Sequence, residues 1–182
     1  MNGYEVINPN LLHWSPILAD WVQRMERFCV MTERSIYGNG ERANFSVLLA
    51  SASHCGYAGA IEIPCYPPTG DRLDIDLLLN DAGAHSAIIE GKFAWFENLD
   101  GDSTIKKANQ TLAKACSDFG RLPLNGTALG VAFCCPSYTR PGAVNALRRQ
   151  IQESLHAFRR CDHDALGLLL SRALYYGGRG ML

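Results

Sequence analysis

The sequence predicts a single α/β domain, in which a central mixed sheet is flanked by helices and further helices lie at both ends of the chain. Two observations favour this class: helical and strand-like patterns alternate along the chain, and Gly- and Pro-rich turns separate them. A third is composition, because 182 residues with 47% hydrophobic and 19% charged side chains are typical of one soluble domain. Such a chain buries roughly 70% of the surface that its unfolded form exposes, so it needs no structural disulfide or metal.

Apolar residues recur at helical spacing in several segments. In the segment 41–54, Phe45, Leu48 and Ala52 form one apolar face, and Gly56 follows the predicted end of the helix. The same reasoning predicts helices over residues 11–34, about 103–119, and 141–176, where one helix follows Pro141-Gly142 and another covers about 164–176.

Three short strands are predicted between the helices at 41–54 and 103–119. They cover residues 60–66, 72–80 and 86–93, and the turn signals at 67–70 and 80–83 suggest an antiparallel meander. The run from Thr127 to Cys135 is unbroken in its apolar character, so we expect a strand in the middle of the sheet, buried on both faces.

Several protein classes do not fit the sequence. The longest apolar stretches fall well short of the ~20 residues of a transmembrane helix, and residues 1–14 lack the basic start of a secretory signal. The seven cysteines include no CxxC pair, which argues against a disulfide scaffold and a zinc finger. We therefore expect a cytoplasmic protein that has no membrane partner.

The net charge of −1 conceals two halves of opposite sign. Residues 1–91 hold 5 Lys or Arg and 11 Asp or Glu, a net −6, whereas residues 92–182 hold 12 and 7, a net +5. A basic patch can bind a polyanion such as nucleic acid, and ordinary surface charge is the alternative. The candidate substrate-binding residues are polar or basic and lie on two predicted helices, where a solvated face is the alternative: Lys106, Lys107, Gln110, Lys114, Arg148 and Arg149.

Three acids and one lysine interrupt the predicted strands. Side chains two residues apart on a strand share a face, so Asp74 lies beside Asp76, and Glu90 lies beside Lys92. If the two strands are antiparallel neighbours, both pairs can form one patch near the strand ends. Adjacent carboxylates are costly to bury and are usually retained for a cation or a substrate, which favours a magnesium site. A solvated strand face with weak ion pairs is the alternative.

Glu41 is a further candidate for this patch. At 100° per residue it lies on the arc of Phe45, Leu48 and Ala52, the face that is expected to turn towards the sheet. The alternative is that Glu41 opens a helix, where the macrodipole favours a carboxylate by ~0.3–1 kcal/mol. Both interpretations stay open at this point.

The order of these features resembles a known family. A helix with Glu41, a strand, a strand with Asp76, a strand with Glu90-Gly91-Lys92, a helix and a buried strand are similar to the αβββαβ core of the PD-(D/E)XK nuclease superfamily, the restriction-endonuclease-like fold. The resemblance covers about residues 41–135. It matches Asp76, which three leucines follow, to the first motif acid, and Glu90 and Lys92 to the second motif. The proline of the family name is absent, because Ile75 precedes Asp76.

The resemblance implies a role for each matched residue. Asp76, Glu90 and the carbonyl of Gly91 would hold Mg²⁺, with Mn²⁺ as a substitute, and Lys92 would assist the attacking water. Glu41 would match the helix acid that many members add, and Asp74 is a further candidate ligand. Gln110 resembles a polar residue on the helix after the motif. Gly91 itself is unusual in mid-strand and marks a bulge or a close approach of the backbone to a ligand.

The predicted function is a magnesium-dependent nuclease in which Asp76, Glu90, Lys92 and Glu41 form the catalytic set. Its expected partner is nucleic acid, with DNA favoured over RNA by family habit, and the terminal helices are where a homodimer or protein contact would be built. Two alternatives remain: a non-catalytic nucleic-acid or protein-binding module on the same fold, and a subunit of a defence or repair complex. Fold alone does not decide between them.

Overall fold

A computed structural model gives the chain an α/β structure, with one four-stranded mixed sheet, one two-stranded sheet and helices. The structure describes residues 4–6, 9–32, 39–66, 70, 72–81, 86–96, 101–118, 127–136 and 167–169. In chain order the described elements are β1 (Tyr4–Val6), the 3₁₀ helix η1 (Pro9–Trp14), α1 (Ser15–Thr32), α2 (Gly40–His54), β2 (Ala58–Cys65), β3 (Leu73–Asn80), β4 (Ser86–Phe96), α3 (Gly101–Asp118), β5 (Thr127–Pro136) and β6 (Gly167–Leu169).

The larger sheet has the strand order β2-β3-β4-β5. β2, β3 and β4 form an antiparallel meander, as the turn signals predict, and β5 runs parallel to β4. A parallel neighbour requires a crossover connection, and α3 occupies that place in the chain between β4 and β5. The predicted helices at 41–54 and 103–119 correspond to α2 and α3 and are confirmed to within two residues at each end.

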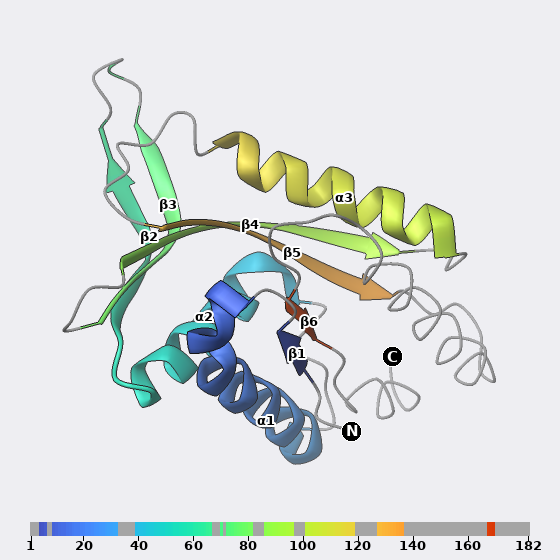
Figure 1. The fold of residues 1–182 in the computed structure, drawn as a ribbon, viewed down its shortest axis with the longest axis horizontal. Coiled ribbons are helices and arrows are strands. Elements are labelled where there is room, and N and C mark those ends of the chain that lie inside the picture. The colour runs from blue at the N-terminus through green and yellow to red at the C-terminus, as the bar shows by residue number, and fades with distance from the viewer. Residues whose placement is uncertain are drawn as a thin grey trace.

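Helices cover both faces of this sheet. Figure 1 shows α3 on one face, and α1 and α2 on the other. The sequence provides for this arrangement by alternation, because the odd-numbered residues of β3 are buried among α1 and α2, as Leu77 and Leu79 show. The opposite face is marked by Gly130 of β5, where an added Cβ would meet Leu112 and Cys116 of α3.

The predicted central position of the strand at 127–135 is wrong for the described sheet. β5 pairs only with β4 and lies at the edge of the four strands that the structure describes. Thr127 and Ala128 are exposed, and Leu129 to Ala132 are half-buried, so the strand is not covered on both faces along its length. An unbroken apolar run is therefore compatible with an edge strand when one face packs on a helix and the other adjoins the core.

The predicted terminal helices have different outcomes. The helix at 11–34 is present as η1 followed by α1, which ends at Thr32. The helix predicted over 164–176 is wrong at Gly167–Leu169, because these residues form β6 and pair antiparallel with β1. A short leucine run is compatible with either a helix or a strand. Here the pairing with β1, near the other end of the chain, makes it a strand. Residues 141–166 lie outside the described residues, so the helix predicted after Pro141-Gly142 is not tested.

Among the helices that the structure describes, none combines the length and apolar character needed to cross a membrane.

Candidate active site

The site lies where β3 and β4 separate. Their pairing runs from Asn80 and Ser86 to Leu77 and Ile89 and then stops. β4 continues to Phe96 and stays paired with β5 over that whole length. Figure 1 shows β2 and β3 turning away from β4 and β5. One side of β4 beyond Ile89 therefore carries backbone groups that β3 no longer satisfies, which is costly unless other partners replace it.

Two carboxylates take the place of β3 on this side of β4. The backbone N–H of Gly91 donates to Oδ2 of Asp76 at 2.8 Å, and that of Phe93 donates to Oε1 of Glu41 at 2.6 Å. Residues two apart on a strand direct their N–H and C=O groups to the same side. We call the β3-facing backbone of Gly91, Phe93 and Trp95 the released edge. Glu41 and Asp76, which lie 35 positions apart in the sequence, thus reach neighbouring points of one edge.

Glu41 therefore does more than open a helix. Its position on the arc of Phe45 and Leu48 is confirmed, since both are buried and Glu41 reaches β4. The helix-opening interpretation also holds, because Glu41 is the acidic residue in the first turn of α2. The two interpretations, presented as alternatives by the sequence, are compatible in the structure.

Glu90 is the most deeply buried acid of the site. It is 4% exposed, and its Oε1 has no hydrogen-bond partner among the described residues. Burial raises the pKa of Glu90 to about 7, and the neighbouring Asp76 carboxylate adds to this rise because two like charges repel each other. The charge of Lys92 acts in the opposite direction on the same pKa. Asp76, Glu90 and Lys92 are thus close enough to influence one another, as their strand parity predicts.

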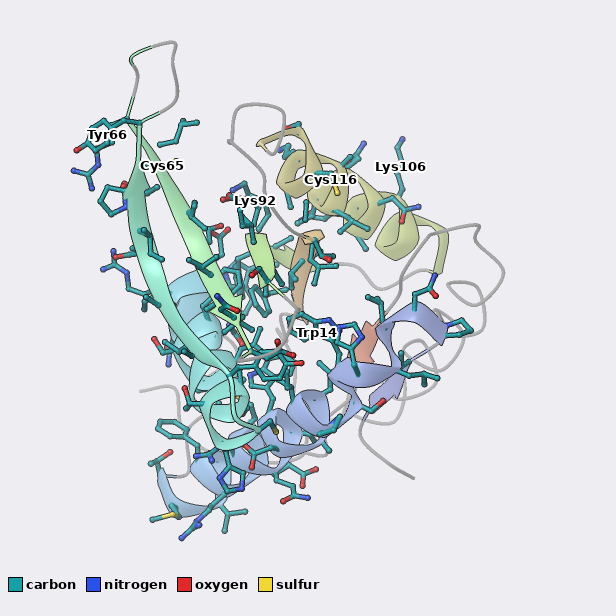
Figure 2. All side chains as sticks on the ribbon, turned by 60° about the vertical axis from the view of Figure 1, so that its left-hand side comes forward. Trp14, Cys65, Tyr66, Lys92, Lys106 and Cys116 are labelled. Atoms are coloured by element: carbon teal, nitrogen blue, oxygen red, sulfur yellow. The ribbon has the colours of Figure 1, made fainter. Side chains whose placement is uncertain are left out.

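Lys92 is half-buried and lies two residues beyond Glu90 on β4. In Figure 2 it has α3 on one side and the β2–β3 pair on the other. Its charge acts on Glu90, so the ammonium group lies near that carboxyl. This is the surrounding expected of a group that acts on a bound anion.

Packing explains why position 91 is a glycine. The sequence predicted either a bulge or a close approach of the backbone to a ligand at this position. A Cβ added to it would lie 2.5 Å from Cε2 of Phe45, a distance at which something must shift. The Phe45 ring, from α2, also contacts Phe133 of β5 edge-on, with the ring centroids 5.0 Å apart. Gly91 therefore lets α2 approach β4 closely, and this approach is what allows Glu41 to reach Phe93.

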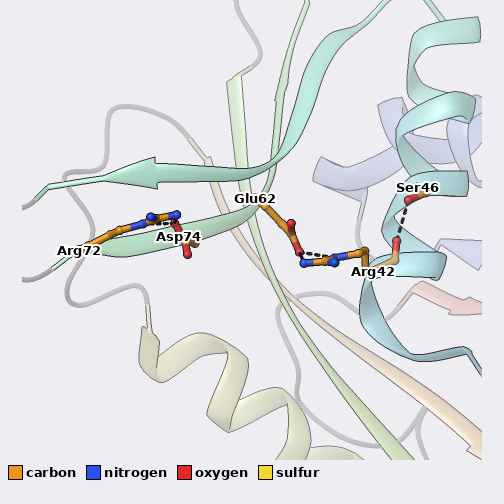
Figure 3. Close-up of polar contacts among 5 residues, drawn as sticks. All are labelled: Arg42, Ser46, Glu62, Arg72 and Asp74. Atoms are coloured by element: carbon orange, nitrogen blue, oxygen red, sulfur yellow. Dashed lines mark hydrogen bonds and ion pairs between the residues drawn. The ribbon is translucent and has the colours of Figure 1, made fainter.

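Asp74 is not brought to the other acids. It lies on the exposed part of β3 and forms an ion pair with Arg72, whose Nε donates to Oδ1 of Asp74 at 2.9 Å (Figure 3). Asp74 raises the pKa of Arg72, as an adjacent carboxylate does. Within the described residues, no group of three or more His, Cys, Asp or Glu side chains is placed to hold a metal ion.

Glu62 on β2 is a further acid of this region that was not among the predicted site residues. In the β2–β3 register Glu62 would oppose Asp76, but the pairing skips both residues, and Glu62 has a left-handed backbone with φ of 55°. Such a conformation is strained for any residue with a Cβ. The side chain forms an ion pair with Arg42, the neighbour of Glu41 on α2 (Figure 3). The alternation in Ile61-Glu62-Ile63 was a signal that Glu62 faces away from the two isoleucines. Nothing in the sequence indicates its left-handed backbone.

The candidate substrate-binding residues of α3 are exposed. Lys106, Lys107, Gln110 and Lys114 all lie on the solvent side of this helix. Lys107 is the one that reaches the released edge, because its Nζ donates to the backbone oxygen of Trp95. Arg148 and Arg149 lie outside the described residues. The contact of Lys107 with Trp95 could not be read from the sequence, since it depends on how α3 crosses β4.

Comparisons with known proteins do not extend this description. No protein-family model matches the chain, and neither a curated protein nor a solved structure is detectably similar to it.

Proposed function

We propose that the chain is a metal-dependent nuclease that hydrolyses phosphodiester bonds, with DNA the favoured substrate. The observation that carries this proposal is that Asp76 and Glu41 accept from successive backbone N–H groups of the released edge, while the buried Glu90 lies near Asp76 and Lys92. The order α2-β2-β3-β4-α3-β5 supports it, because the same succession of elements defines the restriction-endonuclease-like core that the sequence resembles.

The donor set fits a hard divalent cation. Asp76 and Glu41 each bind the released edge through one carboxylate oxygen, and a cation at Asp76 would compete with the contact between the Asp76 and Glu90 side chains. Oε1 of Glu90 is buried without a partner among the described residues, and a cation would satisfy it. Mg²⁺ needs only one or two carboxylates, because waters and substrate oxygens complete its octahedron. The carbonyl of Gly91 is on the same edge, whereas Asp74 forms an ion pair with Arg72 and is outside this set.

Each residue of the site would have its own role in the reaction. Asp76, Glu90 and Glu41 would hold Mg²⁺, or Mn²⁺ in its place, which stabilises charge on the phosphoryl oxygens. Lys92 would place the attacking water and oppose the negative charge that develops on the phosphate. The buried carboxyl of Glu90 is ready to lose its proton near neutral pH, so cation binding would compete with that proton.

The test is cleavage by the full chain. Supercoiled plasmid, linear duplex, single-stranded DNA and RNA are each incubated with Mg²⁺, Mn²⁺ or a chelator. We expect cleavage only with metal, and a rate about 10²- to 10⁴-fold lower for Asp76→Asn and for Lys92→Ala. The matched control is Asp20→Asn, which removes a part-buried, ion-paired aspartate on α1 and should leave the rate unchanged. Circular dichroism of each variant shows that it is folded.

Three results would overturn the nuclease proposal. One is cleavage that persists in the chelator, and another is equal cleavage by the wild type and the Lys92→Ala variant. A complete lack of cleavage on all substrates, together with a melting temperature that metal does not raise, would have the same consequence, because a ligand bound only by the folded state must stabilise it.

The second candidate is a non-catalytic nucleic-acid or protein-binding module, alone or as a subunit of a defence or repair complex. One observation favours it: among the described residues no preformed group of three acids is placed to hold a metal. In that case Asp76 and Glu41 serve as caps for the released edge, and Glu90 is a protonated buried carboxyl. The melting experiment with metal separates the two candidates.

A further inference from the structure

One tryptophan of the chain differs from the other two. Trp14 and Trp21 are 7% and 6% exposed, as expected for large apolar rings, whereas Trp95 is 43% exposed. Exposing an indole is costly, and Trp95 lies near the end of β4, on the strand that carries Glu90 and Lys92. An exposed aromatic ring beside a functional site is a common feature of binding surfaces.

The Trp95 ring is held in position from one side. Phe93 contacts it edge-on, with ring centroids 5.2 Å apart and an angle of 81° between the rings. The backbone of Phe93 is in turn fixed by Glu41 of the candidate active site. The ring thus keeps exposed surface while its orientation is restricted, which lowers the entropy cost of stacking a ligand on it.

One lysine side chain reaches the backbone of the same residue. Lys107 donates to the backbone oxygen of Trp95, and the neighbouring Lys106 is exposed on α3 (Figure 2). An exposed aromatic ring whose own backbone oxygen accepts from an ammonium group is suited to a ligand that has both flat apolar rings and negative charges.

We propose that Trp95 stacks on an unpaired base of a single-stranded nucleic acid, whose phosphates contact Lys107 and Lys106. This inference rests on the proposed nuclease function and names its substrate class. The bases of an intact duplex are stacked on each other, so only a single strand or a frayed end offers a free face to Trp95. Every base has such a face, and stacking therefore gives affinity without sequence preference.

Tryptophan fluorescence provides a direct readout, because Trp95 is the exposed indole. The full chain, with Asp76→Asn to prevent cleavage, is titrated with 20-nucleotide oligo-dT, oligo-U and a duplex of the same length. We expect both single strands to quench the emission and to bind at least about 10-fold more tightly than the duplex. The relative affinities of oligo-dT and oligo-U distinguish DNA from RNA as the source of the base.

Variants then assign the effect to the ring. Labelled oligo-dT should bind Trp95→Ala about 5- to 150-fold more weakly, as expected for the loss of one stacked base, and Trp95→Phe should recover part of that affinity. The matched control is Tyr66→Ala, which removes an aromatic ring that is 70% exposed just beyond β2, and its affinity should equal that of the parent.

The experiments distinguish a protein that lacks the stacking role of Trp95 from one that is not a nuclease. Metal-dependent cleavage with equal affinity for duplex and single strand, or with full affinity in Trp95→Ala, would overturn the stacking role and leave the nuclease standing. A protein that neither cleaves nor binds any nucleic acid would overturn both, and Trp95 would then belong to a protein contact.

Discussion

The two parts of β4 before and after Ile89 are built from the same strand but are stabilised differently. Residues 87–89 lie between two strands, with β3 on one side and β5 on the other. Residues 90–96 keep β5 but have lost β3, and the acids Asp76 and Glu41 satisfy two of the backbone groups that β3 leaves. The paired part is apolar and buried, whereas the released part carries Glu90, Lys92 and the exposed Trp95 and accepts contacts from Asp76 and Glu41.

This difference teaches how a sheet can carry a charged site without losing its core. A backbone N–H must find an acceptor, and a carboxylate provides a strong one. By replacing a strand with carboxylates, the chain brings acids together at a place where the backbone itself requires them. The released part is therefore expected to contribute function, and the paired part is expected to contribute stability.

The largest effect on stability should come from the paired part. Leu77 is fully buried between the helices and the sheet, so Leu77→Ala should lower the free energy of unfolding by about 2–5 kcal/mol. Leu78→Ala, on the half-buried opposite face, is the control and should cost clearly less. Urea denaturation measures both. If Lys92→Ala in the released part costs as much as Leu77→Ala, the division between stability and function does not hold.

The next effect concerns the pH dependence of the metal-free protein. The pKa of Glu90 is about 7 in the folded chain and near 4.5 when it is unfolded. Between these values the folded state keeps a proton that the unfolded state has lost, so stability falls as the pH rises. The penalty is absent below about pH 4.5 and complete above pH 7, where it reaches at most about 3 kcal/mol.

Glu90→Gln isolates this contribution. Urea denaturation in a chelator from pH 4.5 to 8 should show that the variant gains stability relative to the wild type as the pH rises. A constant difference between the two proteins would mean that Glu90 is not forced to ionise in a buried site. Adding Mg²⁺ at pH 8 should stabilise the wild type more than the variant, because the cation offsets the buried charge.

A smaller effect should come from Gly91, where the released edge meets α2. Gly91→Ala places a methyl group against the Phe45 ring, and overpacking of this kind costs about 1–3 kcal/mol. Phe45→Leu removes the clash, so the double variant should be more stable than the sum of the two single changes predicts. Strictly additive costs in urea denaturation would show that the two residues do not press on each other.

Local patterns were sufficient to predict much of this arrangement. The bounds of α2, α3 and the meander follow from periodicity and turns, and strand parity placed Asp76, Glu90 and Lys92 on one patch. Two errors concern partners distant in sequence. Nothing local indicates that β5 is an edge strand, or that Gly167–Leu169 pairs with Tyr4–Val6. One error is local, because Asp74 forms an ion pair with Arg72, only two residues away in the sequence.

The smallest effect tests the strain opposite Asp76. Glu62 has a left-handed backbone, which costs a residue with a Cβ about 1 kcal/mol relative to glycine. Glu62→Gly and Glu62→Gln both remove the exposed ion pair with Arg42, so their difference reports the backbone alone. We expect the glycine variant to be the more stable by about 1 kcal/mol in urea denaturation. A glutamine variant that is equally stable or more so would mean that the interruption of the β2–β3 ladder is not strained. In that case Glu62 would play no part in ending the paired region, which would end only where β3 and β4 separate after Ile89.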